Sequence, residues 1–305
     1  MKVFFNVCVK QYNQRKDFSV YRPASIDKPK PNSVMFVKKE YISSISNIDQ
    51  ITECLIFWPK DEPIPAALSN NNVFVISEKP HIDFCLFFKQ NGIKSLPKNE
   101  TFRIINGAFI CDGAIIGENV NIYPGAYIGS DVVIGSNVYI GSGAKVLPYS
   151  IIGNNVIIRE NAVIGADGLT TDRDDNGHAL TMPQFGSVVI EDNVEIGANT
   201  VVAKGAIDET IIRAGSKIDN STFVSHNVKI GKNTFIVGET ILFGSSSVGD
   251  GCIISGNCTI MNRVNIGDNS ILGAGAVATK SIPNNSVAIG CPAKVIREKR
   301  SGEEV

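Results

Sequence analysis

Residues 122–146 read IYPGAYIGSDVVIGSNVYIGSGAKV, and an aliphatic residue returns at every sixth position of this stretch. The same step of six extends outward in both directions and, with two interruptions, covers residues 104–272. Neither an α-helix nor a hairpin sheet has a period of six. This period instead predicts a solenoid of short strands, each sending one aliphatic side chain inward. The predicted inward positions are Ile104, Ile110, Ile116, Ile122, Ile128, Ile134, Ile140, Val146, Ile152, Ile158, Ile164, Ile190, Ile196, Val202, Ile212, Ile218, Val224, Ile230, Ile236, Leu242, Val248, Ile254, Ile260, Ile266 and Leu272.

The repeat also predicts how the strands stack. Three hexapeptides, about 18 residues, make one coil of a triangular prism, and each coil hydrogen-bonds to the next at a spacing of about 4.8 Å. The aligned aliphatic side chains then form one continuous core. We therefore expect a mainly β protein whose residues 101–288 form a parallel β-helix.

An interruption of the repeat predicts a loop that leaves the prism. Between Ile164 and Ile190 the sequence ADGLTTDRDDNGHALTMPQFGSVV is polar and rich in turn residues. We expect an extruded loop within residues 166–187. Insertions in solenoids often carry binding function, whereas the alternative is a solvated loop without a role.

Residues 1–100 lack the repeat and predict a small α/β domain. Strands are expected at 33–37, 54–58 and 72–77, where short apolar runs are bounded by polar residues. A helix is expected over 81–92, ending at a glycine. The charged tail, residues 289–305, is expected to form short helix or coil.

Composition narrows the class of protein. The 305 residues carry a net charge of −1, which argues against binding to nucleic acid or to anionic lipid. The sequence has no run of 18 apolar residues and no signal-peptide pattern at its start, so we expect a cytoplasmic protein without membrane insertion. The seven cysteines form no CxxC pair, which indicates reduced thiols and no metal site.

The three histidines are the candidates for a general base at neutral pH. His81 lies in an apolar segment and is expected to be structural, and His178 lies in the polar loop and is expected to be solvated. His226 follows the inward Val224 by two residues, which places it at a corner of the prism, pointing outward. One coil further on stands Gly244, whose backbone N–H could stabilise an oxyanion beside the imidazole. A base and an oxyanion donor one strand spacing apart suit acyl transfer.

Four motifs carry a resemblance to a known family. In order and spacing they resemble the UDP-3-O-acylglucosamine N-acyltransferases of lipid A synthesis, over roughly residues 30–270. The motifs are MPQFGSV at 182–188, VEIG at 194–197, KIDN at 217–220 and SHNVKIG at 225–231.

The resemblance implies a left-handed β-helix, a homotrimer and active sites between neighbouring prisms. It implies that His226 removes a proton from the sugar amine and that Gly244 is the oxyanion glycine. It also implies that Asp219 helps to position the acceptor and the histidine, and that Asn220 and Asn227 belong to the substrate-binding motifs.

Three positions depart from the family pattern. Arg263 stands where the family has a second histidine two coils above the first. The family's DRG sequence reads Ala203-Lys204-Gly205 here. In the expected nucleotide pocket of the small domain Tyr41 is kept, but Lys38 takes the place of an asparagine, so a nucleotide other than a uridine nucleotide is possible.

The C-terminal end resembles a different group, the hexapeptide sugar acetyltransferases that use coenzyme A. In that group small residues form a groove for the pantetheine arm, which implies this role for Ala274 and Ala276. Basic residues there meet the nucleotide phosphates, which implies this role for Lys280 and Lys294. The alternative is that both are ordinary surface lysines.

Taken together, the sequence predicts a homotrimeric N-acyltransferase that moves an acyl group from acyl-CoA to the amine of a nucleotide-linked amino sugar, for a surface polysaccharide or glycan. A first alternative is the lipid A enzyme itself, whose donor is a hydroxyacyl group on the phosphopantetheine of acyl carrier protein. A second is a binding solenoid without catalysis. A hexapeptide carbonic anhydrase is disfavoured, because it needs three metal-binding histidines and the regular repeat holds only His226.

Overall fold

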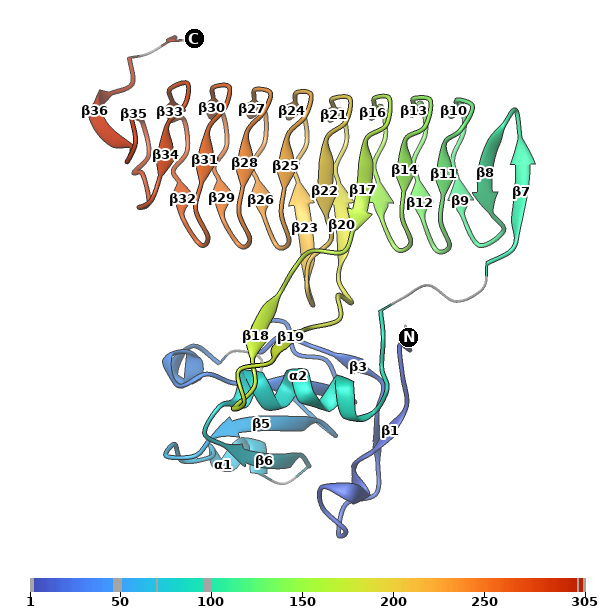
Figure 1. The fold of residues 1–305 in the computed structure, drawn as a ribbon, viewed down its shortest axis with the longest axis vertical. Coiled ribbons are helices and arrows are strands. Elements are labelled where there is room, and N and C mark those ends of the chain that lie inside the picture. Colours follow the sequence, from blue (N-terminus) through green and yellow to red (C-terminus); the bar gives the residue numbers. More distant parts are fainter. Residues whose placement is uncertain (1–2, 46–50, 70, 96–99, 301, 304–305) are drawn as a thin grey trace. The chain divides into compact units, whose positions relative to one another are not determined.

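The computed structural model describes residues 3–45, 51–69, 71–95, 100–300 and 302–303. The chain divides into two compact units (Figure 1). The small unit comprises the described residues of 1–96, 169–185 and 206–208, and the large unit comprises those of 97–168, 186–205 and 209–305. Residues 96–99, next to the expected domain boundary at residue 100, lie outside the described part.

The large unit is a prism of three parallel sheets, and its strands are mostly two residues long. Sheet I contains β10 (Asn121–Ile122), β13 (Tyr139–Ile140), β16 (Ile157–Ile158), β21 (Glu195–Ile196), β24 (Lys217–Ile218), β27 (Phe235–Ile236), β30 (Ile253–Ile254), β33 (Ile271–Leu272), β35 (Ser286–Ile289) and β36 (Lys294–Glu298). Sheet II contains β7 (Phe102–Ile105), β8 (Ala108–Cys111), β11 (Tyr127–Ile128), β14 (Lys145–Val146), β17 (Val163–Ala166), β22 (Val201–Ala203), β25 (Phe223–Val224), β28 (Ile241–Leu242), β31 (Thr259–Ile260) and β34 (Val277–Ala278). Sheet III contains β9 (Ile115–Ile116), β12 (Val133–Ile134), β15 (Ile151–Ile152), β20 (Ser187–Ile190), β23 (Glu209–Ile212), β26 (Lys229–Ile230), β29 (Ser247–Val248) and β32 (Asn265–Ile266).

The register of the strands confirms the predicted solenoid. Tyr127 pairs with Lys145, one coil further on, and the chain visits sheets I, II and III in turn. The repeated aliphatic residues are buried in one continuous core, as shown by Ile128, Ile140 and Ile164, each fully buried.

The first position of the predicted ladder is wrong. The side chain of Ile104 is 66% exposed, because β7 runs antiparallel to β8 across the end of the prism and does not begin a coil. The inward ladder therefore starts at Ile110, which is buried.

Asparagines shape one corner of the prism. Asn119, Asn137 and Asn155 adopt φ values of 54°, 59° and 55°, in the left-handed region that asparagine tolerates better than most residues. The Asn119 side-chain amide donates to Asn137 Oδ1 at 3.2 Å, and that of Asn137 donates to Asn155 Oδ1 at 3.3 Å. A side-chain ladder thus links successive coils between sheets III and I.

Two connections differ from a plain loop or coil. The predicted insertion contains a hairpin of β18 (Thr171–Arg173) and β19 (Ala179–Thr181). The tail was expected to be helix or coil, and this is wrong for residues 294–298, which form β36 antiparallel to β35. The edge of β35 offers unpaired backbone groups, and β36 satisfies them.

The small unit contains a parallel sheet in the order β3 (Arg22–Pro23), β4 (Ser33–Phe36), β5 (Leu55–Pro59) and β6 (Val73–Ser77). Its aromatic core lies between β4, β5 and α2 (Pro80–Gln90), and the insertion contributes Phe185, whose ring lies 5.1 Å from that of Phe88. The predicted strands and helix are present, and Gly92 ends the helix with a φ of 64°. The remaining elements are β1 (Val7–Cys8), β2 (Ser19–Val20), α1 (Ala66–Ser69) and two 3-10 helices, η1 (Val9–Gln11) and η2 (Lys39–Ser44).

Candidate active site

His226 stands two residues after the end of β25, at the corner between sheets II and III, and is half-buried. Its Nδ1 lies 3.1 Å from Oδ1 of Asn227, so this contact holds one side of the ring. Asn227 is itself fixed, because its backbone N–H donates to Thr210 Oγ1 at 2.8 Å. With Nδ1 as the hydrogen-bonded nitrogen, Nε2 is the nitrogen that could accept a proton.

Gly244 covers that nitrogen from the next coil. The pairing of Val224 with Leu242 brings Gly244 over His226, and Ser245 N–H donates to the carbonyl of His226 at 2.9 Å. A β-carbon at Gly244 would lie 2.6 Å from both Cε1 and Nε2 of the imidazole, so no side chain fits there. Among the described residues, the Gly244 N–H has no hydrogen-bond acceptor. The corner thus brings the ring nitrogen close to the backbone of Gly244, whose N–H could donate to a ligand.

A charged pair lies beneath the same histidine. The pairing of Val202 with Val224 places Lys204 in the coil directly below His226. Lys204 is buried, and its Nζ lies 2.6 Å from Oδ1 of Asp167. The next residue, Gly168, touches His226: a β-carbon there would lie 2.8 Å from the histidine Cβ. Sequence reasoning missed Asp167 and Gly168, although their Asp-Gly pair at the end of the first run of hexads was the available signal.

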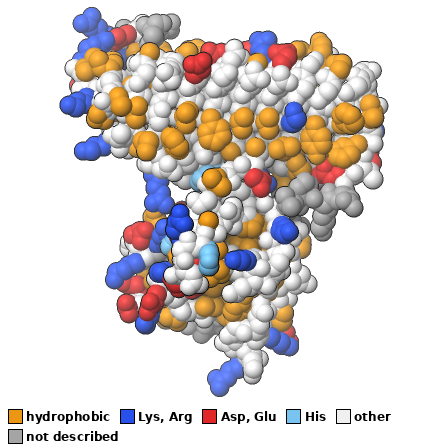
Figure 2. Space-filling view, viewed as in Figure 1, with side chains coloured by type: hydrophobic (Ala, Val, Ile, Leu, Met, Phe, Trp, Pro, Cys, Tyr) orange, Lys and Arg blue, Asp and Glu red, His pale blue; other side chains and the backbone are white. Residues whose placement is uncertain are grey.

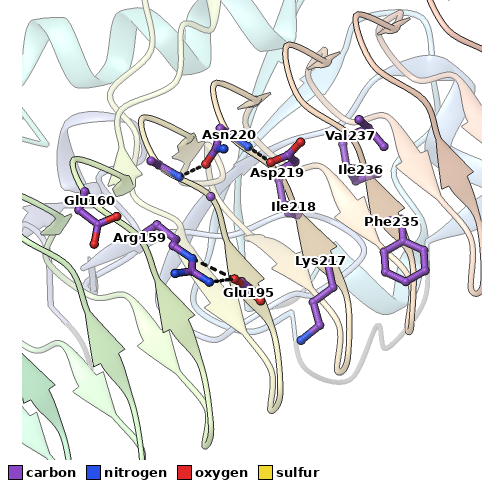
Figure 3. Close-up of a pocket in the computed structure, with 12 residues that line it drawn as sticks. Arg159, Glu160, Glu195, Lys217, Ile218, Asp219, Asn220, Phe235, Ile236 and Val237 are labelled. Carbon is purple, nitrogen blue, oxygen red and sulfur yellow. Dashed lines mark hydrogen bonds and ion pairs between the residues drawn. The ribbon is translucent and has the colours of Figure 1, made fainter.

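Asp219 and Asn220 lie at a different corner from His226. They follow β24, between sheets I and II, and their polar atoms bind the backbone (Figure 3). Asp219 accepts the N–H groups of Asn220 at 2.7 Å and Gly238 at 3.2 Å, and Asn220 accepts the Ala198 N–H at 2.6 Å. Because β25 separates the two corners, the structure does not bring Asp219 to His226 within one prism.

A groove of about 600 Å³ runs along sheet I beside Asp219. Figure 3 shows Arg159 joined to Glu195 on one side of the groove, with Lys217 and Phe235 further along. The Phe235 side chain is 50% exposed. The groove therefore offers an apolar surface beside charged groups. Its lining residues are Arg159, Glu160, Glu195, Gly197, Ala198, Lys217, Ile218, Asp219, Asn220, Phe235, Ile236 and Val237.

Arg263 is exposed and lies at the same corner as His226, two coils further on, but it is one residue out of register with His226. The pairing of Leu242 with Ile260 puts Asn262 directly above Gly244, whereas Arg263 lies in line with Ser245. The expected placement of Arg263 two coils above His226 is therefore wrong by one residue, because each full coil here spans 18 residues.

The residues expected to hold coenzyme A are only partly available at the surface. Ala274, Lys280 and Lys294 are exposed, and Lys294 belongs to β36. Ala276 is fully buried in the core of the prism, so the expectation that it lines a groove is wrong. It precedes the inward Ala278 by two residues, a position that the regular coils fill with a small buried side chain, such as Ala126 before Ile128.

The small unit has a cleft of about 500 Å³ at the carboxyl ends of β4, β5 and β6. Ligands of open α/β sheets commonly bind at this edge. Lys38 lines the cleft, whereas Tyr41, in η2 and 40% exposed, is not among the lining residues. The full lining set is Lys38, Lys39, Glu40, Pro59, Lys60, Asp61, Glu62, Glu78, Lys79, Pro80 and His81.

His81 and His178 both pair with aspartates of the insertion. His81 forms an ion pair with Asp172 of β18, and His178 Nδ1 lies 3.2 Å from Asp174 Oδ2. Burial of Asp172 opposes its ionisation, but the Arg173 N–H and the neighbouring His81 outweigh burial and hold the pKa of Asp172 below its usual value. His81 therefore ties the insertion to α2 of the small unit, whereas the His178 contact lies within the insertion itself.

Two further findings concern the described residues. No group of three His, Cys, Asp or Glu side chains among them is arranged to hold a metal ion. No helix in the described part of the chain is long and apolar enough to cross a membrane.

The repeats and the fold define the class of this protein. The family model for bacterial transferase hexapeptide (six repeats) matches residues 131–166 and 245–280, within the prism described above. These parts of the chain thus carry hexapeptide repeats similar to those of bacterial transferases.

Curated relatives confirm the particular resemblance. A UDP-3-O-acylglucosamine N-acyltransferase from Methylobacterium nodulans is 39% identical over 137 residues, which cover 45% of this chain and 39% of that protein. A protein of the same name from Francisella tularensis is 53% identical over 79 residues, 26% of this chain and 23% of the relative. The match to these relatives therefore spans less than half of their length.

Solved structures agree in fold. A UDP-N-acetylglucosamine acyltransferase from Bacteroides fragilis is 28% identical, with a TM-score of 0.53 over 64% of this chain and 74% of that one. The enzyme of that name from Campylobacter jejuni gives a TM-score of 0.57 at 24% identity, over 64% of this chain and 75% of that one. The second likeness is one of fold alone.

Proposed function

We propose that this protein is an N-acyltransferase that moves an acyl group from a thioester, acyl-CoA, to the amine of a nucleotide-linked amino sugar. The single observation that carries the proposal is the corner at which the His226 imidazole faces the Gly244 backbone. The names of the curated relatives support the choice of a nucleotide amino sugar as acceptor.

The proposed chemistry uses the two groups in turn. His226 Nε2 accepts a proton from the acceptor amine as the nitrogen attacks the thioester carbonyl carbon. The Gly244 N–H donates to the oxygen that becomes negative in the tetrahedral intermediate. The C–S bond then breaks, and the imidazolium returns the proton to the leaving thiolate, which leaves an amide and a free thiol. General-base assistance of this kind contributes typically about 10²- to 10⁴-fold in rate.

A homotrimer is part of the proposal, because one prism holds its polar groups at separate corners. Asp219 and Asn220 could join His226 in one site only if they come from a neighbouring copy. Lys280 and Lys294 are exposed and are proposed to meet the phosphates of coenzyme A, with Ala274 beside the pantetheine arm. Tyr41 and Lys38 of the small unit are proposed to meet the nucleotide.

The test is a panel of nucleotide-linked amino sugars, each combined with acyl-CoA donors of increasing chain length and assayed for thiol release. We expect release that requires the acceptor amine, and the N-acetylated sugar serves as a matched control without a free amine. Thiol release that is equal with and without the amine would mean hydrolysis, which contradicts the proposal.

A second candidate is UDP-3-O-acylglucosamine N-acylation, the reaction in the names of the curated relatives. For this candidate we take hydroxyacyl carrier protein as the acyl donor. The same panel, with hydroxyacyl carrier protein added as a donor, separates the two candidates. Thiol release with short acyl-CoA but not with acyl carrier protein supports our proposal, and the reverse result supports the second candidate. A binding solenoid without catalysis would give neither release.

A further inference from the structure

We propose that Lys204 and Asp167 are positioning residues for His226, and that their ion pair holds Gly168 against the imidazole. This inference rests on the proposed function, because it gives the ion pair the role of orienting the imidazole of His226, the proposed general base. The residues concerned all belong to the prism.

The first step of the argument is the burial of Lys204. Its relative exposure is 8%, and the Lys204 N–H donates to the carbonyl of Ala166 at 2.8 Å. A buried ammonium group is costly unless it is paired. The carboxylate of Asp167, 2.6 Å from Nζ, is the ion-pair partner that the structure supplies. The side-chain pair and the backbone bond together fix residues 166–167 to the strand beneath His226.

The second step is the contact that this attachment produces. Gly168 follows Asp167 and lies close to the base of the histidine: an added β-carbon would lie 2.8 Å from Cβ, 3.2 Å from Cγ and 3.1 Å from Cδ2 of His226. Gly244 contacts the opposite end of the ring, at Cε1 and Nε2. Asn227 holds Nδ1. The ring is therefore restrained on three sides. The Asp167–Lys204 pair secures the side formed by Gly168, just before the chain enters the insertion.

The third step explains why such a pair is needed here. The regular ladder is interrupted at this point, with a register shift between Ile164 and Ala166 where β17 meets β22. Past that shift the chain leaves the coil for the insertion, so strand pairing no longer holds residues 167–168. An ion pair is a side-chain substitute for the missing strand contacts. Without it, Gly168 could move away and the imidazole could adopt another rotamer.

The test compares Lys204→Met, Asp167→Asn and Gly168→Ala with the wild type. Lys204→Arg keeps the charge, and Lys232→Met removes an exposed lysine at another corner of the prism as a matched control. We expect kcat to fall by about 10- to 100-fold in the first three variants, with KM for both substrates within about two-fold, because a small misplacement of a reacting group is costly. Lys204→Arg should keep most of the wild-type kcat, because it keeps the positive charge.

A second readout does not depend on activity. The ring carbon–proton signals of His226 can be assigned by nuclear magnetic resonance, since the chain has three histidines. We expect these signals to shift or broaden in Lys204→Met, Asp167→Asn and Gly168→Ala, and to stay unchanged in Lys232→Met. If Lys204→Met does not fold, the partly exposed Asp167 and Gly168 variants decide the question.

The outcomes separate this inference from the proposed function. Wild-type kcat and wild-type His226 signals in Asp167→Asn and Gly168→Ala would overturn the positioning role. A wild-type protein without transfer activity would overturn the proposed function, whereas the ring signals would still report whether the ion pair positions His226. A uniform loss of thermal stability with unchanged kcat would show that the pair is merely structural, and would also overturn the inference.

Discussion

At the scale of single residues, the geometry of the His226 corner depends on the lack of a side chain at Gly244. Its missing side chain leaves room for the imidazole, and in the described part of the chain its N–H has no hydrogen-bond acceptor. The coil count from His226 to Gly244 could be predicted from the sequence, because the hexads here run without a break. Asp167 and Gly168 could not be placed in this way, because they follow the end of a run and their position depends on a register shift.

Gly244→Ala should abolish most of the proposed transfer. The new methyl group would lie 2.6 Å from Cε1 and Nε2 of His226, so the ring or the backbone N–H must move. Loss of an oxyanion donor alone lowers kcat by about 10²- to 10³-fold, which is the expected size. Steady-state kinetics of amide formation would measure it.

Gly113→Ala is the matched control for Gly244→Ala. A β-carbon at Gly113 meets its nearest atom at 3.6 Å, an ordinary contact distance. We expect the wild-type rate in this variant. Equal rates in Gly244→Ala and Gly113→Ala would contradict the role of Gly244.

The thiols should differ sharply in reactivity. Burial, together with the negative charge of Asp172, raises the pKa of Cys85 to about 11. At pH 8 only about one thousandth of this group is then thiolate, the form that reacts. Cys8 and Cys291 are exposed. In the native protein, Ellman's reagent at pH 8 should modify Cys8 and Cys291 quickly and Cys85 slowly, and the rate at Cys85 should rise as the pH approaches 11. Equal labelling of Cys85 and Cys8 at pH 8 would contradict this expectation.

At the scale of the elements, the coils were predictable wherever each strand has neighbours on both sides, and unpredictable at the ends. Ile104 fits the period of six, but no coil precedes it, so β7 crosses the end as an antiparallel strand. The tail carries no repeat, yet it forms β36 because β35 has a free edge to satisfy. Ala276 shows a further limit. The repeat predicts the inward position of Ala278, but the position two residues before it is also buried, and this position holds Ala276.

The asparagine ladder should contribute to the stability of the prism. Asn137→Ala removes two side-chain hydrogen bonds and places alanine at a φ of 59°. The left-handed region costs alanine about 1–2 kcal/mol, so we expect the free energy of unfolding to fall by about 1–3 kcal/mol. Asn137→Gly loses the same bonds without the backbone strain. Urea unfolding should therefore rank wild type above Asn137→Gly and Asn137→Ala lowest, and equal midpoints for the two variants would contradict the backbone argument.

At the scale of the whole molecule, the outward side chains of the prism suggest how copies of it associate. Figure 2 shows hydrophobic side chains gathered along the prism. On sheet III, Ile115, Val133 and Ile151 occupy successive coils with exposures of 65%, 38% and 44%. Contiguous exposed apolar side chains are typical of interaction surfaces. They fit the proposed trimer, in which Asp219 of one copy and His226 of another could share a site.

A double variant tests the proposed assembly. Val133→Glu with Ile151→Glu places two charges on this surface and leaves the inward ladder untouched. We expect the wild type to sediment as a trimer, and the double variant to sediment as a monomer that retains its β-sheet circular dichroism and loses transfer. A wild-type monomer that turns over would contradict the shared site.

One substitution bears on the catalytic account more directly than any other. This substitution is His226→Gln, which puts a side chain of similar size at the same corner. With an amino-sugar nucleotide and an acyl-CoA that the wild type couples, mass spectrometry can quantify the amide that this variant forms. We predict at least about a 100-fold loss of amide, with sedimentation and circular dichroism unchanged. Amide formation at the wild-type rate by this folded variant would show that another group removes the proton.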